Sequence, residues 1–157
     1  ANWRYTTVFH TIAVFETLHS LGTRLSETQR ELLLKRVKGM AEWLYDNLDE
    51  NSQPNINYCA TNSLALQYAG MFFNEKKYLF QAKQLAEYAY RHFTENGLFY
   101  GESRNHDAYS LMKCRSVDIG YDLEESIPSL VKYARLAKDE EALSYLTEKL
   151  FQMFHHQ

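Results

Sequence analysis

The chain has 157 residues, of which 45% are hydrophobic, so it is long enough for one domain with a buried core. Its 17 basic and 20 acidic residues give a net charge of −3, and no basic run could follow a phosphate backbone, which argues against nucleic acid as a partner. The sequence contains no run of about 18 apolar residues, so it predicts no membrane span. The sequence shows no signal peptide, but it opens at Ala1 without a methionine, so an excised piece of a longer chain stays an alternative. The compartment also stays open.

The sequence also predicts no metal site and no cofactor. Cys59 and Cys114 are its two cysteines, and neither belongs to a CxxC pair. No two histidines four residues apart accompany a glutamate, as a zinc-binding helix requires. Whether the two cysteines form a disulfide stays open at this stage.

Helical periodicity occurs in six segments, and no segment of more than a few residues alternates as a strand does. The segments are 4–21, 27–48, 57–74, 76–94, 122–138 and 139–155. Short links join the first to the second, the third to the fourth and the fifth to the sixth, whereas 49–56 and 95–121 are longer. Short links favour antiparallel neighbours, so the sequence predicts three antiparallel helical hairpins in one all-α domain, or a fragment of a larger one.

The two helices of a hairpin differ in polarity. Segment 57–74 has no charged residue, and segment 4–21 has Glu16 as its lone interior charge. Such helices are typical of positions buried on more than one side, whereas 27–48 and 76–94 are amphipathic. We therefore expect an inner and an outer helix in each hairpin.

The hairpins also repeat in sequence. Each inner helix starts at a similar tetrapeptide, at steps of 53 residues (2 to 55) and 63 residues (55 to 118). The three copies are Asn2-Trp3-Arg4-Tyr5, Asn55-Ile56-Asn57-Tyr58 and Asp118-Ile119-Gly120-Tyr121. The outer helices repeat as well, in MAEWLYDNL at 40–48 and LAEYAYRHF at 85–93.

The stretches YAGMFFNEKKYLFQAKQLAEYAYRHFTENGLFYGE and DIGYDLEESIPSLVKYARLAKDEEAL resemble the repeating hairpins of the (α/α) toroid proteins called six-hairpin glycosidases. Glycoside hydrolases, unsaturated glucuronyl hydrolases and several polysaccharide lyases share that toroid. The resemblance implies a carbohydrate-active domain that acts on or binds an oligosaccharide or polysaccharide.

A closed toroid has six hairpins, and this chain has three. The chain is then half of a larger enzyme, a partner of another chain, or an open arc. The alternative is a non-catalytic helical-repeat module for protein–protein interaction. Tetratricopeptide repeats, however, have a period of about 34 residues, much shorter than the steps seen here.

The resemblance places a saccharide cleft where the inner helices start, with segment 95–121 as a lid. Aromatic faces stack on sugar rings, while amides, carboxylates and basic groups bind hydroxyl and acidic groups. The substrate-binding residues expected on this basis are Trp3, Tyr5, Asn57, Tyr58, Asn62, Arg104, His106, Tyr109 and Tyr121.

Four acids occupy the third of these starts. Glu124 borders the apolar stripe of the helix that follows, so we expect it to be a buried acid, and Asp118 precedes a glycine turn. We predict that Asp118 and Glu124 are the catalytic pair. Asp122 and Glu125 have the spacing of a capping box, and local hydrogen bonding is the alternative for Asp118.

Two reaction types fit these residues. A hydrolase needs two carboxyl groups as general acid and general base. A polysaccharide lyase needs a tyrosine or histidine base and an arginine or asparagine that neutralises a uronate carboxylate, and the lid offers Arg104, His106, Tyr109 and Arg115. The sequence does not choose between them.

Overall fold

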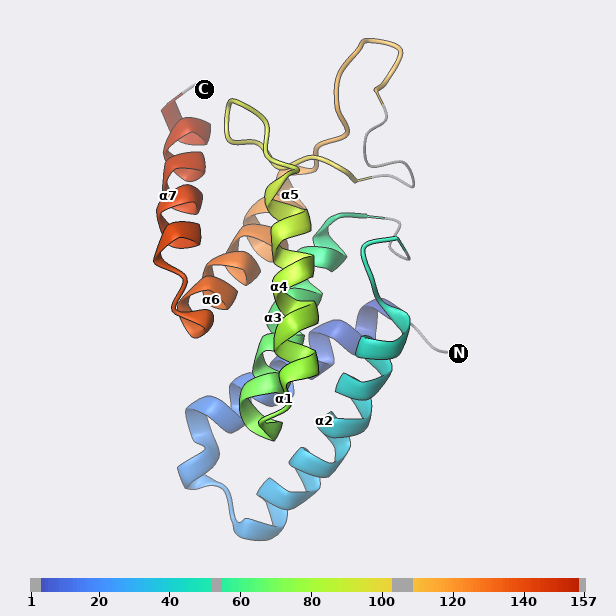
Figure 1. Ribbon diagram of the computed structural model, residues 1–157, viewed down its shortest axis with the longest axis vertical. Helices are drawn as coiled ribbons and strands as arrows, with labels where there is room; N and C mark the ends of the chain where they lie inside the picture. Colours follow the sequence, from blue (N-terminus) through green and yellow to red (C-terminus); the bar gives the residue numbers. More distant parts are fainter. Residues whose placement is uncertain (1–3, 52–54, 103–108, 156–157) are drawn as a thin grey trace.

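The computed structural model describes residues 4–51, 55–102 and 109–155, and in these residues the chain is built from helices (Figure 1). The elements are α1 (Arg4–Leu21), η1 (Gly22–Arg24), α2 (Glu27–Asn47), α3 (Asn57–Phe73), α4 (Lys76–Tyr90), α5 (Ile119–Tyr121), η2 (Asp122–Ser126), α6 (Ile127–Ala137) and α7 (Glu140–His155). The predicted all-α class and the three hairpins α1–α2, α3–α4 and α6–α7 are confirmed. Outside the helices, the described residues form only isolated β-bridges.

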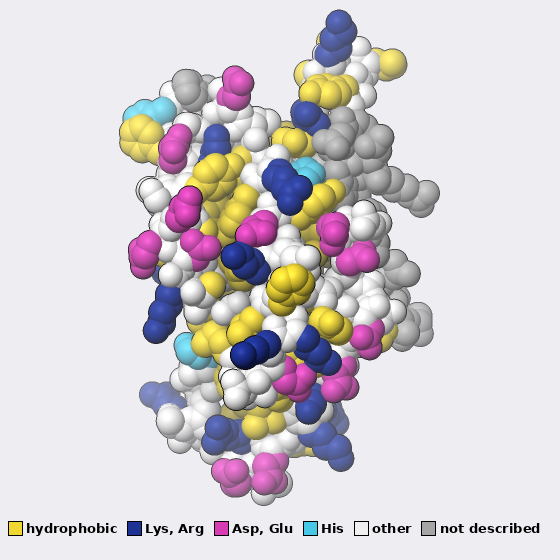
Figure 2. Space-filling model, in the orientation of Figure 1, with side chains coloured by type: hydrophobic (Ala, Val, Ile, Leu, Met, Phe, Trp, Pro, Cys, Tyr) yellow, Lys and Arg dark blue, Asp and Glu magenta, His cyan; other side chains and the backbone are white. Residues whose placement is uncertain are grey.

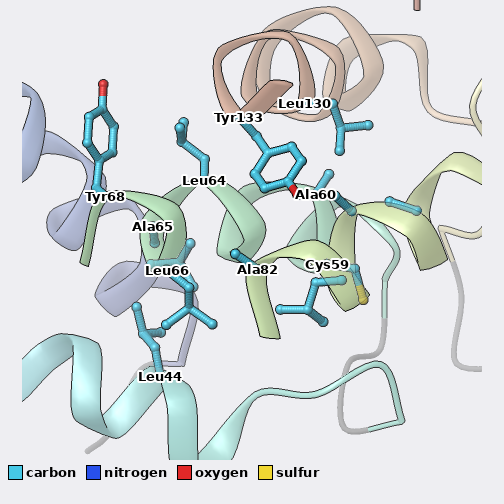
Figure 3. Packing of buried hydrophobic residues seen from close by; sticks show 14 of the residues in the cluster. Leu44, Cys59, Ala60, Leu64, Ala65, Leu66, Tyr68, Ala82, Leu130 and Tyr133 are labelled. Carbon is cyan, nitrogen blue, oxygen red and sulfur yellow. The ribbon is translucent and has the colours of Figure 1, made fainter. Parts of the chain in front are cut away.

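Helix α3 is the centre of the fold. It packs against α1, α2, α4, α6 and η2, and thirteen of its seventeen residues are buried. Small residues such as Ala60 and Ala65 let these neighbours approach closely, and Leu64 and Leu66 fill the space between them (Figure 3). The absence of charge in this segment therefore predicts its burial correctly.

Helix α1 is less buried than its sequence predicts. Val8, Phe15 and Leu18 are buried on one side, but Phe9 is 36% exposed and Leu21 is 42% exposed. The reason is position, because α1 packs mainly against α2 and α3, whereas α3 packs against α1, α2, α4, α6 and η2.

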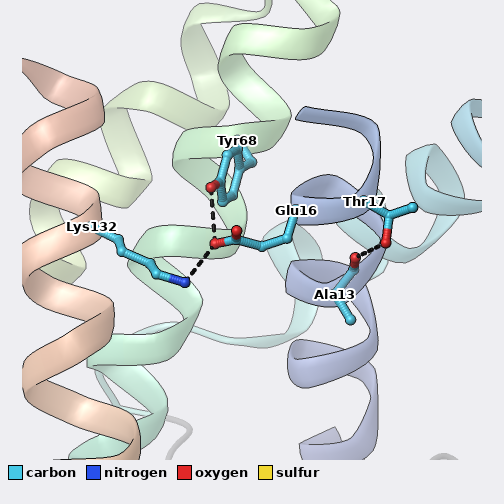
Figure 4. Close-up of polar contacts among 5 residues, drawn as sticks. All are labelled: Ala13, Glu16, Thr17, Tyr68 and Lys132. Carbon is cyan, nitrogen blue, oxygen red and sulfur yellow. Dashed lines mark hydrogen bonds and ion pairs between the residues drawn. The ribbon is translucent and has the colours of Figure 1, made fainter. Parts of the chain in front are cut away.

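Glu16 connects the three inner helices. Its Oε1 accepts hydrogen bonds from the Tyr68 hydroxyl on α3 at 3.0 Å and from Lys132 Nζ on α6 at 2.8 Å (Figure 4). Burial alone would raise the pKa of Glu16, but these two hydrogen bonds and the charges of Lys132 and His19 outweigh it and lower the pKa. The lone interior charge of this segment thus connects the first hairpin to the second and the third.

The outer helices carry conventional end signals. Ser26 caps α2 and forms a capping box with Gln29, since each side chain accepts a hydrogen bond from the other residue's backbone N–H. Helix α4 ends at Tyr90, four residues before the predicted end, because the chain turns back there to form the bridge between Phe93 and Phe99.

A π-helical turn, η2, precedes α6. Pro128 has no N–H to donate to the carbonyl of Glu124, and the N–H of Ile127 bonds instead to the carbonyl of Asp122, five residues back. The missing donor is accommodated by an extra residue in this turn. The extra residue rotates α5 and the first residues of η2 relative to α6.

Two simpler points complete the fold. Among the described residues, no helix combines the length and apolar character that crossing a bilayer requires. Cys59 is buried in the core and Cys114 is exposed, and both are free thiols.

Candidate functional site

The starts of α3 and η2 meet the loop 93–102, which returns from the end of α4 (Figure 1). Ile56 donates its N–H to the carbonyl of Gly101 at 3.1 Å, and Phe99 donates its N–H to Asp122 Oδ2 at 3.2 Å. Gly101 has φ +115°, and a side chain at this position would press on Ile56 and His92. The loop is therefore held against both helix starts.

Polar side chains gather beneath this loop. Asn57 donates from Nδ2 to Glu125 Oε2 at 2.7 Å, and the backbone N–H of Asn57 faces the carboxylate of Glu102. We call this group the entrance cluster, and its members are Asn57, Glu102, Asp122, Glu125 and Ser126. It brings together residues from α3, the loop and η2.

Three members of the entrance cluster are buried, Glu102 and Glu125 are half-buried, and the cluster is short of hydrogen-bond donors. Asp122 and Ser126 have no exposed surface, and Asn57 is 1% exposed. Among the described residues, five buried oxygen atoms of the cluster lack a hydrogen-bond partner of good geometry. They are Asn57 Oδ1, Glu102 Oε1 and Oε2, Asp122 Oδ1 and Ser126 Oγ.

Both inner carboxyl groups have raised pKa values. The pKa of Asp122 is raised to about 7, mainly by burial; the hydrogen bond from Phe99 opposes the rise and the charge of Asp118 adds to it. The pKa of Glu102 is also raised to about 7, first by burial and then by the charges of Asp122 and Asp118, against the backbone N–H of Asn57. Near neutral pH, the cluster is therefore poised between protonated and ionised forms.

A finger formed by residues 109–117 projects beside the entrance. Arg115 lies between two aromatic rings, with its Cζ 4.2 Å from the ring centroid of Tyr100 and 4.4 Å from that of Tyr109. The finger exposes Leu111 and Met112 at its tip, and Figure 2 shows hydrophobic and basic side chains gathered there. This stacking presents a cationic, aromatic surface next to the acidic entrance cluster.

The two predicted catalytic acids occupy different environments from those expected. Asp118 is exposed, and its Oδ1 accepts from the N–H groups of Gly120 and Tyr121 at 3.0 and 3.4 Å, which is the local bonding weighed above. The prediction that Glu124 is buried is wrong, because it is exposed. Whether either residue takes part in catalysis stays a prediction.

The capping box predicted for Asp122 and Glu125 is also wrong. Asp122 accepts from Phe99 in the loop, and Glu125 accepts from Asn57 on α3. Asp118 caps this helical segment instead. Both acids therefore make contacts between elements.

The predicted substrate-binding residues divide into two groups. Asn57 lies in the entrance cluster, Tyr58 is half-buried beside it in sequence, and Tyr109 and Tyr121 are exposed. Asn62 instead donates from Nδ2 to the carbonyl of Leu48 at 3.2 Å. Asn62 thus holds the end of α2 and is not part of the entrance cluster.

Other predictions lie outside the described residues. These are Trp3, Arg104 and His106, together with the side chain of Tyr5.

Glu102 and Asp122 are the residues that the sequence reasoning missed. The helical projection of α6 was extended back through 122–124, but the extra residue in η2 shifts the buried face by one position. Leu123 is 43% exposed, whereas Asp122, the residue before it, is fully buried. The signal available was Pro128, whose missing N–H marks where the register changes.

Two further features bear on the type of site. No group of three His, Cys, Asp or Glu side chains in the described part of the chain is placed to hold a metal ion.

A cavity of about 340 Å³ lies between α4 and α7. Its lining residues are Glu87, Tyr90, Asp139, Glu141, Ala142 and Tyr145, none of which was predicted as a site residue.

Comparison with known proteins places the chain in a class related to polysaccharide lyases. Residues 1–156 match the family described as the ulvan lyase N-terminal domain, and the chain belongs to this family. It is 30% identical over 151 residues to the broad-specificity ulvan lyase of Formosa agariphila, an alignment that covers 95% of this chain and 24% of that protein. The chain thus spans about a quarter of the length of this curated relative. No solved structure matches it.

Proposed function

We propose that this chain is the N-terminal helical part of a polysaccharide lyase, and that the entrance beside the finger binds an ulvan-type polysaccharide. The observation that carries the proposal is the Arg115 guanidinium, stacked between Tyr100 and Tyr109 next to the entrance cluster. Family membership supports elimination over hydrolysis and weighs against a protein–protein interaction module. We further propose that more hairpins of the native polypeptide complete a toroid around this entrance.

The proposed chemistry assigns distinct tasks to Arg115 and Tyr109 of the finger. In elimination, a base removes the proton beside a uronate carboxylate, a carbon–carbon double bond forms, and the bond to the leaving sugar oxygen breaks as that oxygen takes a proton. Developing charge on the uronate needs a cation, which Arg115 supplies. The ring of Tyr109, 59% exposed, offers a face on which a sugar can stack.

The acidic entrance cluster does not suit a uronate carboxylate. Glu102, Asp122 and Glu125 together would repel an anion, and no ion pair between described residues neutralises them. We therefore place the acidic group of the sugar toward Arg115 and its hydroxyl groups toward the acids. The opposite charges of Arg115 and the entrance cluster then set the orientation of the bound polysaccharide.

Replacing Arg115 tests this proposal. In the native polypeptide that contains this chain, Arg115→Leu should lower kcat/KM for ulvan at least about tenfold, because a charge-assisted contact contributes about 1.5–3 kcal/mol. The assay follows the ultraviolet absorbance of the unsaturated product. Lys113→Gln is the matched control, since it removes one positive charge from the same finger but from an exposed position outside the stack.

Equal effects of the two substitutions would mean that only the charge of the finger matters, and the proposed contact would be abandoned. The same assay covers Asp118→Asn and Glu124→Gln. Unchanged turnover in both variants would remove these two acids from the catalytic candidates.

A further inference from the structure

We propose that Tyr100 is a positioning residue, whose ring holds the guanidinium of Arg115 in the orientation in which it meets the acidic group of the sugar. The proposal rests on the proposed function, because Tyr100 acts only through Arg115. It adds that this orientation is set from the end of α4.

Arg115 belongs to the finger, whose backbone hydrogen bonds shape a turn. The N–H of Ser110 bonds to the carbonyl of Cys114 at 2.9 Å, and the N–H of Lys113 bonds to the carbonyl of Ser110 at 2.9 Å. A long arginine side chain samples many rotamers. The rings on which the guanidinium packs therefore do much to set its orientation.

Two rings pack on this guanidinium, and they differ in how firmly they are held. Tyr109, 4.4 Å from the Arg115 Cζ, is bridged to Arg115 within the finger and is 59% exposed. Tyr100, 4.2 Å from the same atom, belongs to the loop 93–102 and is 9% exposed. Tyr109 moves with the finger, whereas Tyr100 can hold Arg115 relative to the rest of the protein.

Three contacts fix Tyr100 to the residues that follow α4. Its N–H donates to the carbonyl of His92 at 2.8 Å, and its hydroxyl donates to the carbonyl of Arg91 at 3.2 Å. Its ring lies 5.1 Å from that of His92, which lies 4.9 Å from the ring of Tyr88 on α4. A column of three rings thus runs from α4 to Arg115.

The base of the finger is joined to the loop beside this column. Gly101 donates its N–H to the carbonyl of Ser116 at 2.9 Å, and Ser116 Oγ donates to the carbonyl of Glu102 at 3.1 Å. Tyr100 itself forms a bridge with Val117. These contacts keep the base of the finger next to the ring of Tyr100.

The role of Tyr100 is positioning and not proton transfer. Its hydroxyl donates to the Arg91 carbonyl, so taking a proton from a sugar would disrupt that bond. Stacking uses the face of the ring instead. A guanidinium stacked through its faces forms hydrogen bonds with its N–H edge, which suits both oxygens of a carboxylate.

Activity of the native polypeptide on ulvan tests the proposal through a double-mutant cycle. Tyr100→Leu should lower kcat/KM about fivefold, the effect expected from losing a partly desolvated cation–π contact. Tyr100→Phe keeps the ring and should recover most of this loss. In the Arg115→Leu background, Tyr100→Leu should change kcat/KM less than about twofold, because its partner is absent. Arg115→Lys keeps the charge but not the flat guanidinium, and it should also lose about fivefold or more.

Phe93→Leu is the matched control for a general loosening of the loop. The ring of Phe93 lies 5.0 Å from that of Phe99 and 5.9 Å from that of Tyr145. Its loss disturbs the start of the same loop away from the Arg115 stack. This variant should keep kcat/KM within about twofold of the wild type.

The proposal is overturned if Tyr100→Leu has no effect, if its effect is the same in both backgrounds, or if Phe93→Leu causes an equal loss. Wild-type activity of Arg115→Lys would also overturn it, and this result needs no substitution of a buried residue. An unchanged kcat/KM in Arg115→Leu alone would instead remove the proposed function, on which the role of Tyr100 depends.

Discussion

Phe15→Ala should lower the free energy of unfolding by about 4 kcal/mol, the typical loss when a large aromatic residue is removed from a core. Phe15 has no exposed surface. Its ring lies 5.3 Å from that of Phe72 and 5.8 Å from that of Tyr68, both stacked, and 6.0 Å from that of Phe73 at an angle. The substitution removes the ring contacts of Phe15 with three aromatic residues of α3 and leaves a cavity between the two helices.

Urea unfolding followed by circular dichroism measures this loss. Phe9→Ala is the control on the same helix, because Phe9 is 36% exposed and should cost less than about 1.5 kcal/mol. Similar losses in the two variants would show that the packing of α1 differs from that described. Phe15→Leu, which keeps most of the volume, should recover much of the stability.

The two inner helices α1 and α3 show how far composition predicts burial. Both segments lack charge over most of their length, and both were expected to be buried on more than one side. Burial depends also on how many neighbours a helix has, and α3 has a hairpin on either side while α1 is at the edge. The periodicity of a segment predicts that it is a helix but cannot predict its neighbours.

The entrance cluster shows a second limit of prediction from the sequence. The repeated tetrapeptides correctly predicted that Asn57 marks the start of an inner helix. Glu102, however, reaches this place through a loop, and no local pattern predicts where a loop of this length returns. Glu124, and not Asp122, was expected to be the buried acid because a projection at 3.6 residues per turn fails across a π-helical turn.

Gly97 holds the turn of the loop 93–102 against α7, and Gly97→Ala should lower the free energy of unfolding by about 3 kcal/mol. Its φ of +78° is strained for any residue with a side chain. A Cβ here would also overlap the carbonyl oxygen of Lys149 on α7, and neither backbone can retreat without separating the loop from that helix. The strain and the overlap both oppose the substitution.

Gly39→Ala is the appropriate comparison, since Gly39 lies within α2 with nothing within 4 Å of its Cβ position and should stabilise the chain by about 0.5–1 kcal/mol. The two substitutions are chemically identical, so opposite signs in urea unfolding would isolate the effect of the loop contact. The loop is held by α7 at Gly97 and by Asp122 at Phe99. Gly97→Ala should therefore also reduce the hydrogen-exchange protection of 93–102, and protection equal to the wild type would show that α7 does not hold the loop.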